Sequence, residues 1–112
     1  MCANKADGPM VPDWVGRKAG DVAHDRIASM LVLDIGQAPE WAKRVLCEVV
    51  DVTSGKADGW EMVMNAHILS VGREYSDISS AYEEDGEDGV QVWTGDLQAA
   101  LRAWIAMMEQ GD

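Results

Sequence analysis

The sequence predicts a mainly α-helical fold, a small four-helix, bundle-like single domain. A short β-hairpin around 78–94 is the possible exception to the helical pattern. The chain has 112 residues, which suits one small domain. Apolar residues make up 47% of the chain, well above a disordered composition, so one compact core can form. Apolar residues also recur in steps of three and four over most of the chain, which is typical of helices with one buried face.

We expect residues 1–12 to form a flexible tail, because they are mostly small and polar and include Pro9 and Pro12. Residues 13–112 then form the single domain. A first helix is expected to begin after Asp13, which suits an N-cap, and to end at Gly36. Its apolar positions lie on one helical face: Val15, Ala19, Val22, Ala23, Ile27, Met30 and Leu31.

A second helix is expected to start at Pro39, because proline at the first helical position lacks only an amide hydrogen that would be unpaired there. The sequence Thr-Ser-Gly at 53–55 ends it. Trp41 and four aliphatic residues in the following three turns form its apolar stripe, which predicts that this face is buried.

A third helix is predicted from Asp58, where an Asp three residues before Glu61 resembles a capping box. The alternation of Met62, Met64, Ala66 and Ile68 favours a strand instead, but Val63 and Leu69 interrupt it. We therefore prefer the helix, whose apolar positions are Trp60, Met64, Ile68, Val71, Tyr75, Ile78 and Tyr82.

The last helix, from Thr94 to Gly111, has the clearest pattern. Leu97, Ala100, Leu101, Trp104, Ile105 and Met108 follow the helical repeat without a break. Trp41, Trp60 and Trp104 are expected in the core, since the chain has five Trp and no Phe to supply bulk.

Negative charge is concentrated in the C-terminal third. The net charge is −11, and residues 74–112 carry ten acidic residues against one base, Arg102. The segment 82–89, YEEDGEDG, alone holds five carboxylates. Such a field repels nucleic-acid phosphates and anionic lipid, and it favours a basic protein surface or a cation.

A metal site is not expected in this segment. Counted from Glu84, so that Gly89 is the central glycine of an EF-hand loop, Val90 and Val92 fall at later ligand positions and Gly95 stands where the loop needs a glutamate. The histidines, His24 and His67, lack further ligands at metal-site spacing, and we expect them to be hydrogen-bonded or partly exposed.

Catalysis is also not expected. Phosphate-binding glycine loops and serine-nucleophile motifs are absent, so we expect no cofactor and no catalytic residue. One enzymatic alternative is kept, an all-α, Mg²⁺-dependent nucleotide pyrophosphohydrolase-like protein. It would use carboxylate pairs such as Glu48 with Asp51 and Glu84 with Glu87.

Two cysteines are too few for a disulfide framework, and the start of the chain has no apolar stretch of signal-peptide length. No apolar run reaches the length of a membrane span. A cytoplasmic protein is therefore expected.

The sequence favours a protein-binding function. The expected partner is a basic surface, of a nucleic-acid-binding protein or a toxin, and direct binding of nucleic acid or membrane is not expected. Small acidic inhibitors of phage or bacterial origin, such as anti-CRISPR, immunity or toxin-neutralising proteins, have this general composition. The alternative is an acidic surface that only keeps a homo-oligomeric structural or accessory protein in solution, and a homodimer is one such form. The predicted contact residues are Asp77, Tyr82, Glu83, Glu84, Asp85, Glu87, Asp88, Trp93 and Asp96.

Overall fold

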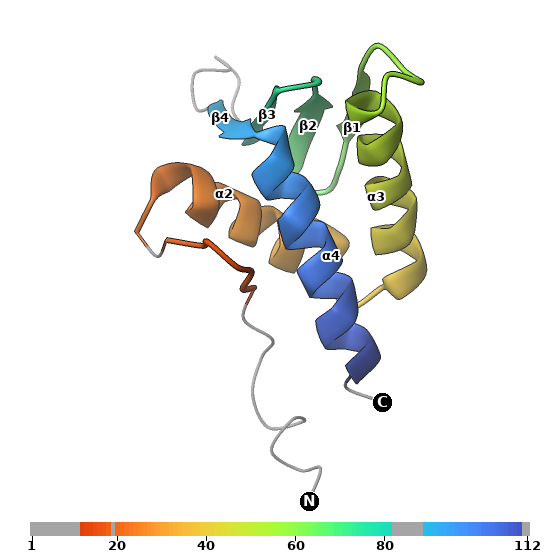
Figure 1. Ribbon diagram of the computed structural model, residues 1–112. Coiled ribbons are helices and arrows are strands. Elements are labelled where there is room, and N and C mark those ends of the chain that lie inside the picture. Colours follow the sequence, from red (N-terminus) through yellow and green to blue (C-terminus); the bar gives the residue numbers. More distant parts are fainter. Residues whose placement is uncertain (1–11, 19, 82–88, 111–112) are drawn as a thin grey trace, which may run out of the picture.

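The computed structural model describes residues 12–18, 20–81 and 89–110, which form an α+β fold (Figure 1). The helical elements are α2 (Val22–Met30), the π-helix η1 (Leu31–Ile35), α3 (Pro39–Thr53) and α4 (Thr94–Gln110). The strands are β1 (Trp60–Val63), β2 (His67–Val71), β3 (Tyr75–Ser80) and β4 (Val90–Trp93). Of the expected tail, only Pro12 lies within the described residues.

The predicted four-helix bundle is wrong, because the expected third helix from Asp58 is a pair of strands that continues into a third. The four strands form an antiparallel sheet in the order β1-β2-β3-β4. The β-hairpin that the sequence pattern left possible around 78–94 corresponds to β3 and β4, where Ile78 is opposite Val90.

Two tight turns build the sheet. Val63 is opposite Ile68, and the N–H of Met64 donates to the His67 carbonyl at 2.8 Å, which leaves Asn65 and Ala66 as the turn. Between β2 and β3, the N–H of Gly72 donates to the Tyr75 carbonyl at 3.0 Å. A Cβ at Gly72 would lie 2.6 Å from that carbonyl oxygen, so the second turn requires glycine.

The first helix starts later than the sequence predicts. Its N-cap is Asp21, whose carboxylate accepts the N–H groups of Ala23 and His24, and not Asp13. Gly16 and Gly20 have φ of 95° and 86°, a backbone that turns the chain before α2 begins. The helix then widens into η1 and ends at Gly36, where φ is 60° and ψ is −149°.

The second and last predicted helices are confirmed. Helix α3 has Pro39 in its first turn, and it ends before Ser54. Helix α4 runs beside it, and both contribute to the core with Val45, Val49, Leu97 and Leu101, which are fully buried. Trp104 is 2% exposed and lies in the core, as expected, while Trp41 and Trp60 are only partly buried and pack against the core without being part of it.

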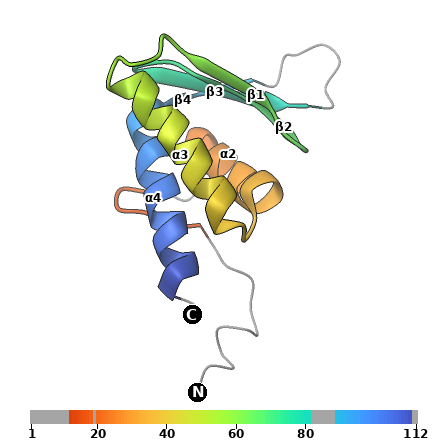
Figure 2. The same cartoon turned by 90° about the vertical axis from the view of Figure 1, so that its right-hand side faces the viewer.

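The helices cover one face of the sheet and leave the other open (Figure 2). The strand positions that face the helices are buried, among them Leu69, Val71, Ile78 and Val92. Among the described residues, no helix combines the length and apolar character needed to cross a membrane.

Candidate functional site

The sheet face away from the helices is the largest uncovered feature of the fold. Side chains alternate between the two faces of a strand, so the outward positions follow from the buried ones. We call this surface the open face. It comprises Glu61, Val63, Ile68, Ser70, Tyr75, Asp77, Ser79, Gln91 and Trp93.

The open face carries acidic groups and no basic ones. The strand register places Glu61 opposite Ser70, Ser70 opposite Asp77, and Asp77 opposite Gln91. This polar row crosses the sheet with a carboxylate on β1 and another on β3. Its outward positions include neither lysine nor arginine, so nothing within the open face neutralises the two carboxylates.

Two aromatic rings stack at one corner of the open face. The rings of Tyr75 and Trp93 lie 4.4 Å apart between centroids and are inclined by 30°. The N–H of Thr94 donates to the Glu74 carbonyl, so the neighbouring pair Tyr75–Trp93 is a non-hydrogen-bonded pair, in which side chains approach most closely. Trp93 remains 56% exposed and Tyr75 43%, and this places the stacked pair at the surface.

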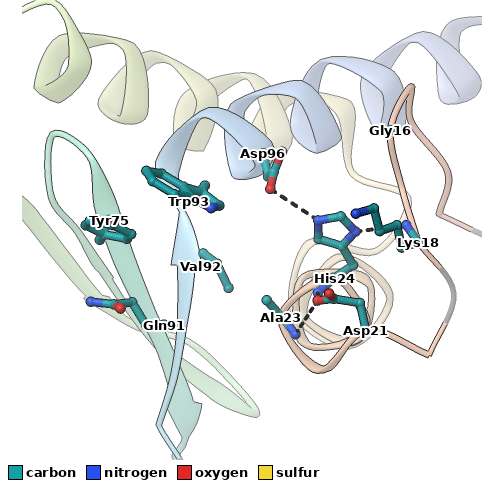
Figure 3. Close-up of a pocket in the computed structure, with 10 residues that line it drawn as sticks. All are labelled: Gly16, Lys18, Asp21, Ala23, His24, Tyr75, Gln91, Val92, Trp93 and Asp96. Carbon is teal, nitrogen blue, oxygen red and sulfur yellow. Dashed lines mark hydrogen bonds and ion pairs between the residues drawn. The ribbon is translucent and has the colours of Figure 1, made fainter.

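A pocket of about 540 Å³ adjoins this corner (Figure 3). Gln91 and Trp93 line one side of it, and Asp21, Ala23 and His24 of the α2 N-terminus line the other. Asp96, in the first turn of α4, lies between the two sides in the view of Figure 3. The pocket thus joins the open face to the helical layer at the edge strand β4.

Hydrogen bonds on both ring nitrogens orient His24 in this pocket. The backbone N–H of Lys18 donates to Nδ1 at 2.9 Å, so Nδ1 is an acceptor and Nε2 carries the hydrogen. Nε2 lies 3.1 Å from Oδ2 of Asp96 and donates to it. The imidazole and the Trp14 ring lie 5.5 Å apart between centroids and are inclined by 65°, and this edge-to-face contact fixes the imidazole from a third direction.

Asp21 adds a second carboxylate to the pocket. Its Oδ1 accepts the N–H groups of Ala23 at 3.0 Å and His24 at 3.1 Å. The hydrogen bonds that the Asp21 carboxylate accepts from the backbone N–H groups, first that of His24 and then that of Ala23, lower the pKa of Asp21 below its ordinary value of 3.8. The carboxylate therefore stays ionised to lower pH than an unpaired aspartate.

The second histidine belongs to a buried structural pair instead. Nδ1 of His67 lies 2.7 Å from Oδ2 of Asp34, and Oδ1 of Asp34 accepts the Ala66 N–H at 2.6 Å. Both side chains are almost fully buried. Within the described residues, no three His, Cys, Asp or Glu side chains are placed to hold a metal ion.

Three of the predicted contact residues lie near the aromatic corner. Asp77 and Trp93 project from the open face on neighbouring strands, and Asp96 follows Trp93 at the start of α4. The other six lie outside the described residues: Tyr82, Glu83, Glu84, Asp85, Glu87 and Asp88.

Sequence reasoning missed Glu61, Tyr75, Gln91 and the Asp21–His24 side of the pocket. The alternation of Tyr75, Asp77 and Ser79 with Ser76, Ile78 and Ser80 carries a signal for an exposed strand face. The pairing of His24 with Asp96, 72 residues apart, has no local sequence signal.

Comparisons with protein-family models, with curated proteins and with solved structures find no match. The fold and the site define an α+β protein with a four-stranded antiparallel meander, helices on one face and an acidic, aromatic open face on the other.

Proposed function

We propose that this protein is an inhibitor or immunity-type protein that docks through its open face on a basic surface of a nucleic-acid-handling partner. The observation that carries the proposal is the open face itself: a sheet surface without helical cover, with two carboxylates and no base. An exposed patch of large apolar or aromatic side chains often marks a protein-binding surface.

Charge would select the partner. The whole chain carries −11, and ten of its twenty acidic residues lie in the last 39 positions. A field of this sign speeds encounter with a cationic surface and disfavours anionic ones. Proteins that handle nucleic acid display clustered lysine and arginine, so they are the partners that this field favours.

The aromatic corner would supply affinity. Trp and Tyr dominate binding hot spots because they bury a large area at low cost in side-chain entropy. Trp93 and Tyr75 are already stacked on each other and lie beside carboxylates. Covering a phosphate-binding surface with this corner would block nucleic acid from it, which is the inhibitory action proposed.

The test uses immobilised basic nucleic-acid-binding domains from the host, with lysozyme as a basic protein outside this class. The variant Glu61→Lys/Asp77→Lys reverses both carboxylates of the open face. The control Glu40→Lys/Glu109→Lys makes the same charge change at the helix ends furthest from the sheet (Figure 1). Binding is measured by surface plasmon resonance at low and at physiological salt.

We expect at least one domain to bind more tightly than lysozyme, to weaken as salt rises, and to release its nucleic acid on binding. The open-face variant should lose at least about tenfold in affinity. Its two introduced lysines would face the basic residues of the partner, and such like-charge contacts cost several kcal/mol. The control should stay within about twofold. Equal loss in both variants would mean that only net charge matters and would reject the open face as the contact.

The pyrophosphohydrolase alternative has no supporting observation. The all-α scaffold that it requires is not the fold, and of its two carboxylate pairs only Glu48 and Asp51, on α3, lie among the described residues.

A further inference from the structure

We propose that the pocket beside β4 binds the guanidinium group of an arginine side chain of the partner, held between the Trp93 ring and the Asp96 carboxylate. This inference rests on the proposed function and deepens it, because it assigns the chemistry of one contact. The argument uses the pocket's shape, its acceptors and its aromatic wall (Figure 3).

The pocket offers a main-chain acceptor, because β4 is an edge strand. The hydrogen bond from Thr94 to Glu74 sets the alternation along β4, so the N–H and C=O groups of Gln91 and Trp93 point away from β3. Gln91, Val92 and Trp93 all line the pocket. On this edge the Gln91 carbonyl can accept a hydrogen bond from a ligand, whereas the Trp93 carbonyl, at the N-cap of α4, already accepts the first hydrogen bond of that helix.

The pocket also offers carboxylate oxygens in a fixed orientation. Oδ2 of Asp96 accepts the Nε2 hydrogen of His24, which is itself held by the Lys18 backbone. Both capping bonds of Asp21 end on Oδ1. Within the described part of the chain, Oδ1 of Asp96 and Oδ2 of Asp21 are therefore left as acceptors at the pocket.

The aromatic wall distinguishes arginine from lysine. A guanidinium is planar, donates five hydrogens in a fixed fork, and stacks on aromatic rings, whereas an ammonium is a compact and strongly hydrated charge. Trp93 is exposed and supported from behind by Tyr75. Lys18 lines the pocket too, but the two negative charges of Asp21 and Asp96 outweigh its single positive charge.

The test titrates the isotope-labelled full chain with N-acetyl-arginine amide, and with N-acetyl-lysine amide as the matched cation, followed by NMR. We expect saturable shifts of the Trp93 indole and of Asp96 with the arginine probe, and at least threefold weaker binding of the lysine probe. Asp96→Asn should weaken arginine binding about tenfold and Trp93→Ala about threefold. Gln91→Lys, which adds an ammonium at the pocket without touching the core, should abolish it.

Glu48→Gln is the matched control, because it removes a carboxylate on α3 that belongs neither to the pocket nor to the open face. It should leave arginine binding unchanged, and thermal melts should verify that every variant is folded. Equal affinity for the two probes, or wild-type affinity in Asp96→Asn and Gln91→Lys, would overturn the inference.

The two proposals fail separately. In one outcome the basic domains bind, Glu61→Lys/Asp77→Lys abolishes their binding, and the pocket variants still bind them normally. The arginine site is then wrong and the docking function stands. If the arginine probe binds as described and no basic domain docks, the proposed function is wrong and the pocket remains an arginine site without it.

Discussion

Each histidine of this protein is paired with an aspartate far away in the sequence. His24 pairs with Asp96, and His67 pairs with Asp34. A buried polar side chain is costly unless it is hydrogen-bonded, so both pairs satisfy groups that the fold brings inside. The surroundings separate their roles, because Asp96 is 38% exposed at the pocket while Asp34 is fully buried.

The first prediction concerns Asp34. Asp34→Ala removes the acceptor of both the His67 ring and the Ala66 N–H. We expect it to lower the free energy of unfolding by about 3–5 kcal/mol, because the partners are left buried and unpaired. Asp34→Asn keeps one acceptor and should lose less. Urea unfolding measures the change.

The control for this prediction is Glu48→Gln, which breaks an exposed pair with Arg44 at 3.4 Å. It should change the free energy of unfolding by less than about 0.5 kcal/mol. A loss below about 1 kcal/mol in Asp34→Ala would show that the buried pair contributes little to stability.

The second prediction concerns the pH dependence of the α2 N-cap. The pKa of Asp21 is lower in the folded protein than its ordinary value of 3.8, so its stabilising effect is complete above that value and is lost as pH falls through the folded pKa. Asparagine caps as well but does not titrate. The urea midpoint of the native protein should therefore fall relative to that of Asp21→Asn between about pH 6 and about pH 2.5. Parallel curves for the two proteins would contradict this.

At the scale of elements, the confirmed predictions are those that local sequence determines. Helices α3 and α4 have a continuous apolar stripe, and α3 also has a proline at its start. The strands β1 and β2 were missed because the turn at Asn65 and Ala66 reverses which face each later residue occupies. Inward positions change from Trp60 and Met62 to His67, Leu69 and Val71, so the period-two alternation is broken at the turn. The predicted helical stripe combined inward Trp60 and Val71 with outward Ile68 and Tyr75.

That turn also lacks the usual hairpin signal. Tight hairpin turns favour Asn-Gly, because both residues then take positive φ. No non-glycine residue among the described ones has positive φ, and Asn65 precedes alanine. The carboxylate of Asp34 on η1 instead accepts the Ala66 N–H. A contact between residues 32 positions apart therefore stabilises the turn, and a local pattern cannot reveal it.

The third prediction concerns the end of η1. Gly36 has φ of 60° and ψ of −149°, a region that is almost restricted to glycine, and its carbonyl accepts the Trp104 indole N–H at 2.7 Å. A Cβ there meets no atom within 4 Å, so Gly36→Ala adds backbone strain alone. We expect a loss of about 1–3 kcal/mol in the free energy of unfolding, measured with urea.

Gly95→Ala is the matched control for Gly36. Gly95 lies in the first turn of α4 without positive φ, and a Cβ there also meets nothing within 4 Å. Alanine should stabilise this position by about 0.4–1 kcal/mol, because it restricts the unfolded chain. The same effect in both variants would show that the conformation of Gly36 does not matter.

For the whole molecule, the arrangement in two layers is what creates the candidate site. The sequence located the acidic C-terminal third and selected Asp77, Trp93 and Asp96. It could not find that Asp77 shares a face with Glu61, since this follows from pairing across three strands. It could not place Asp21 across the pocket from Trp93 either, because α2 meets β4 only through tertiary packing.

The fourth prediction decides between docking on a partner and self-association. In a symmetric dimer through the open face, Glu61 and Asp77 would face a second copy of the same surface, which carries the same two carboxylates and no base, so negative charge would be buried without compensation. We therefore expect a monomer of 12.2 kDa by sedimentation equilibrium at low salt, and the same mass at high salt. A mixture of the Glu61→Lys variant with the native protein provides the sharpest check. Across an open-face contact in this mixture, opposite charges would face each other, so charge would favour the dimer. A dimer in the native protein that Trp93→Ala dissociates would identify the open face as a self-interface and contradict the docking proposal.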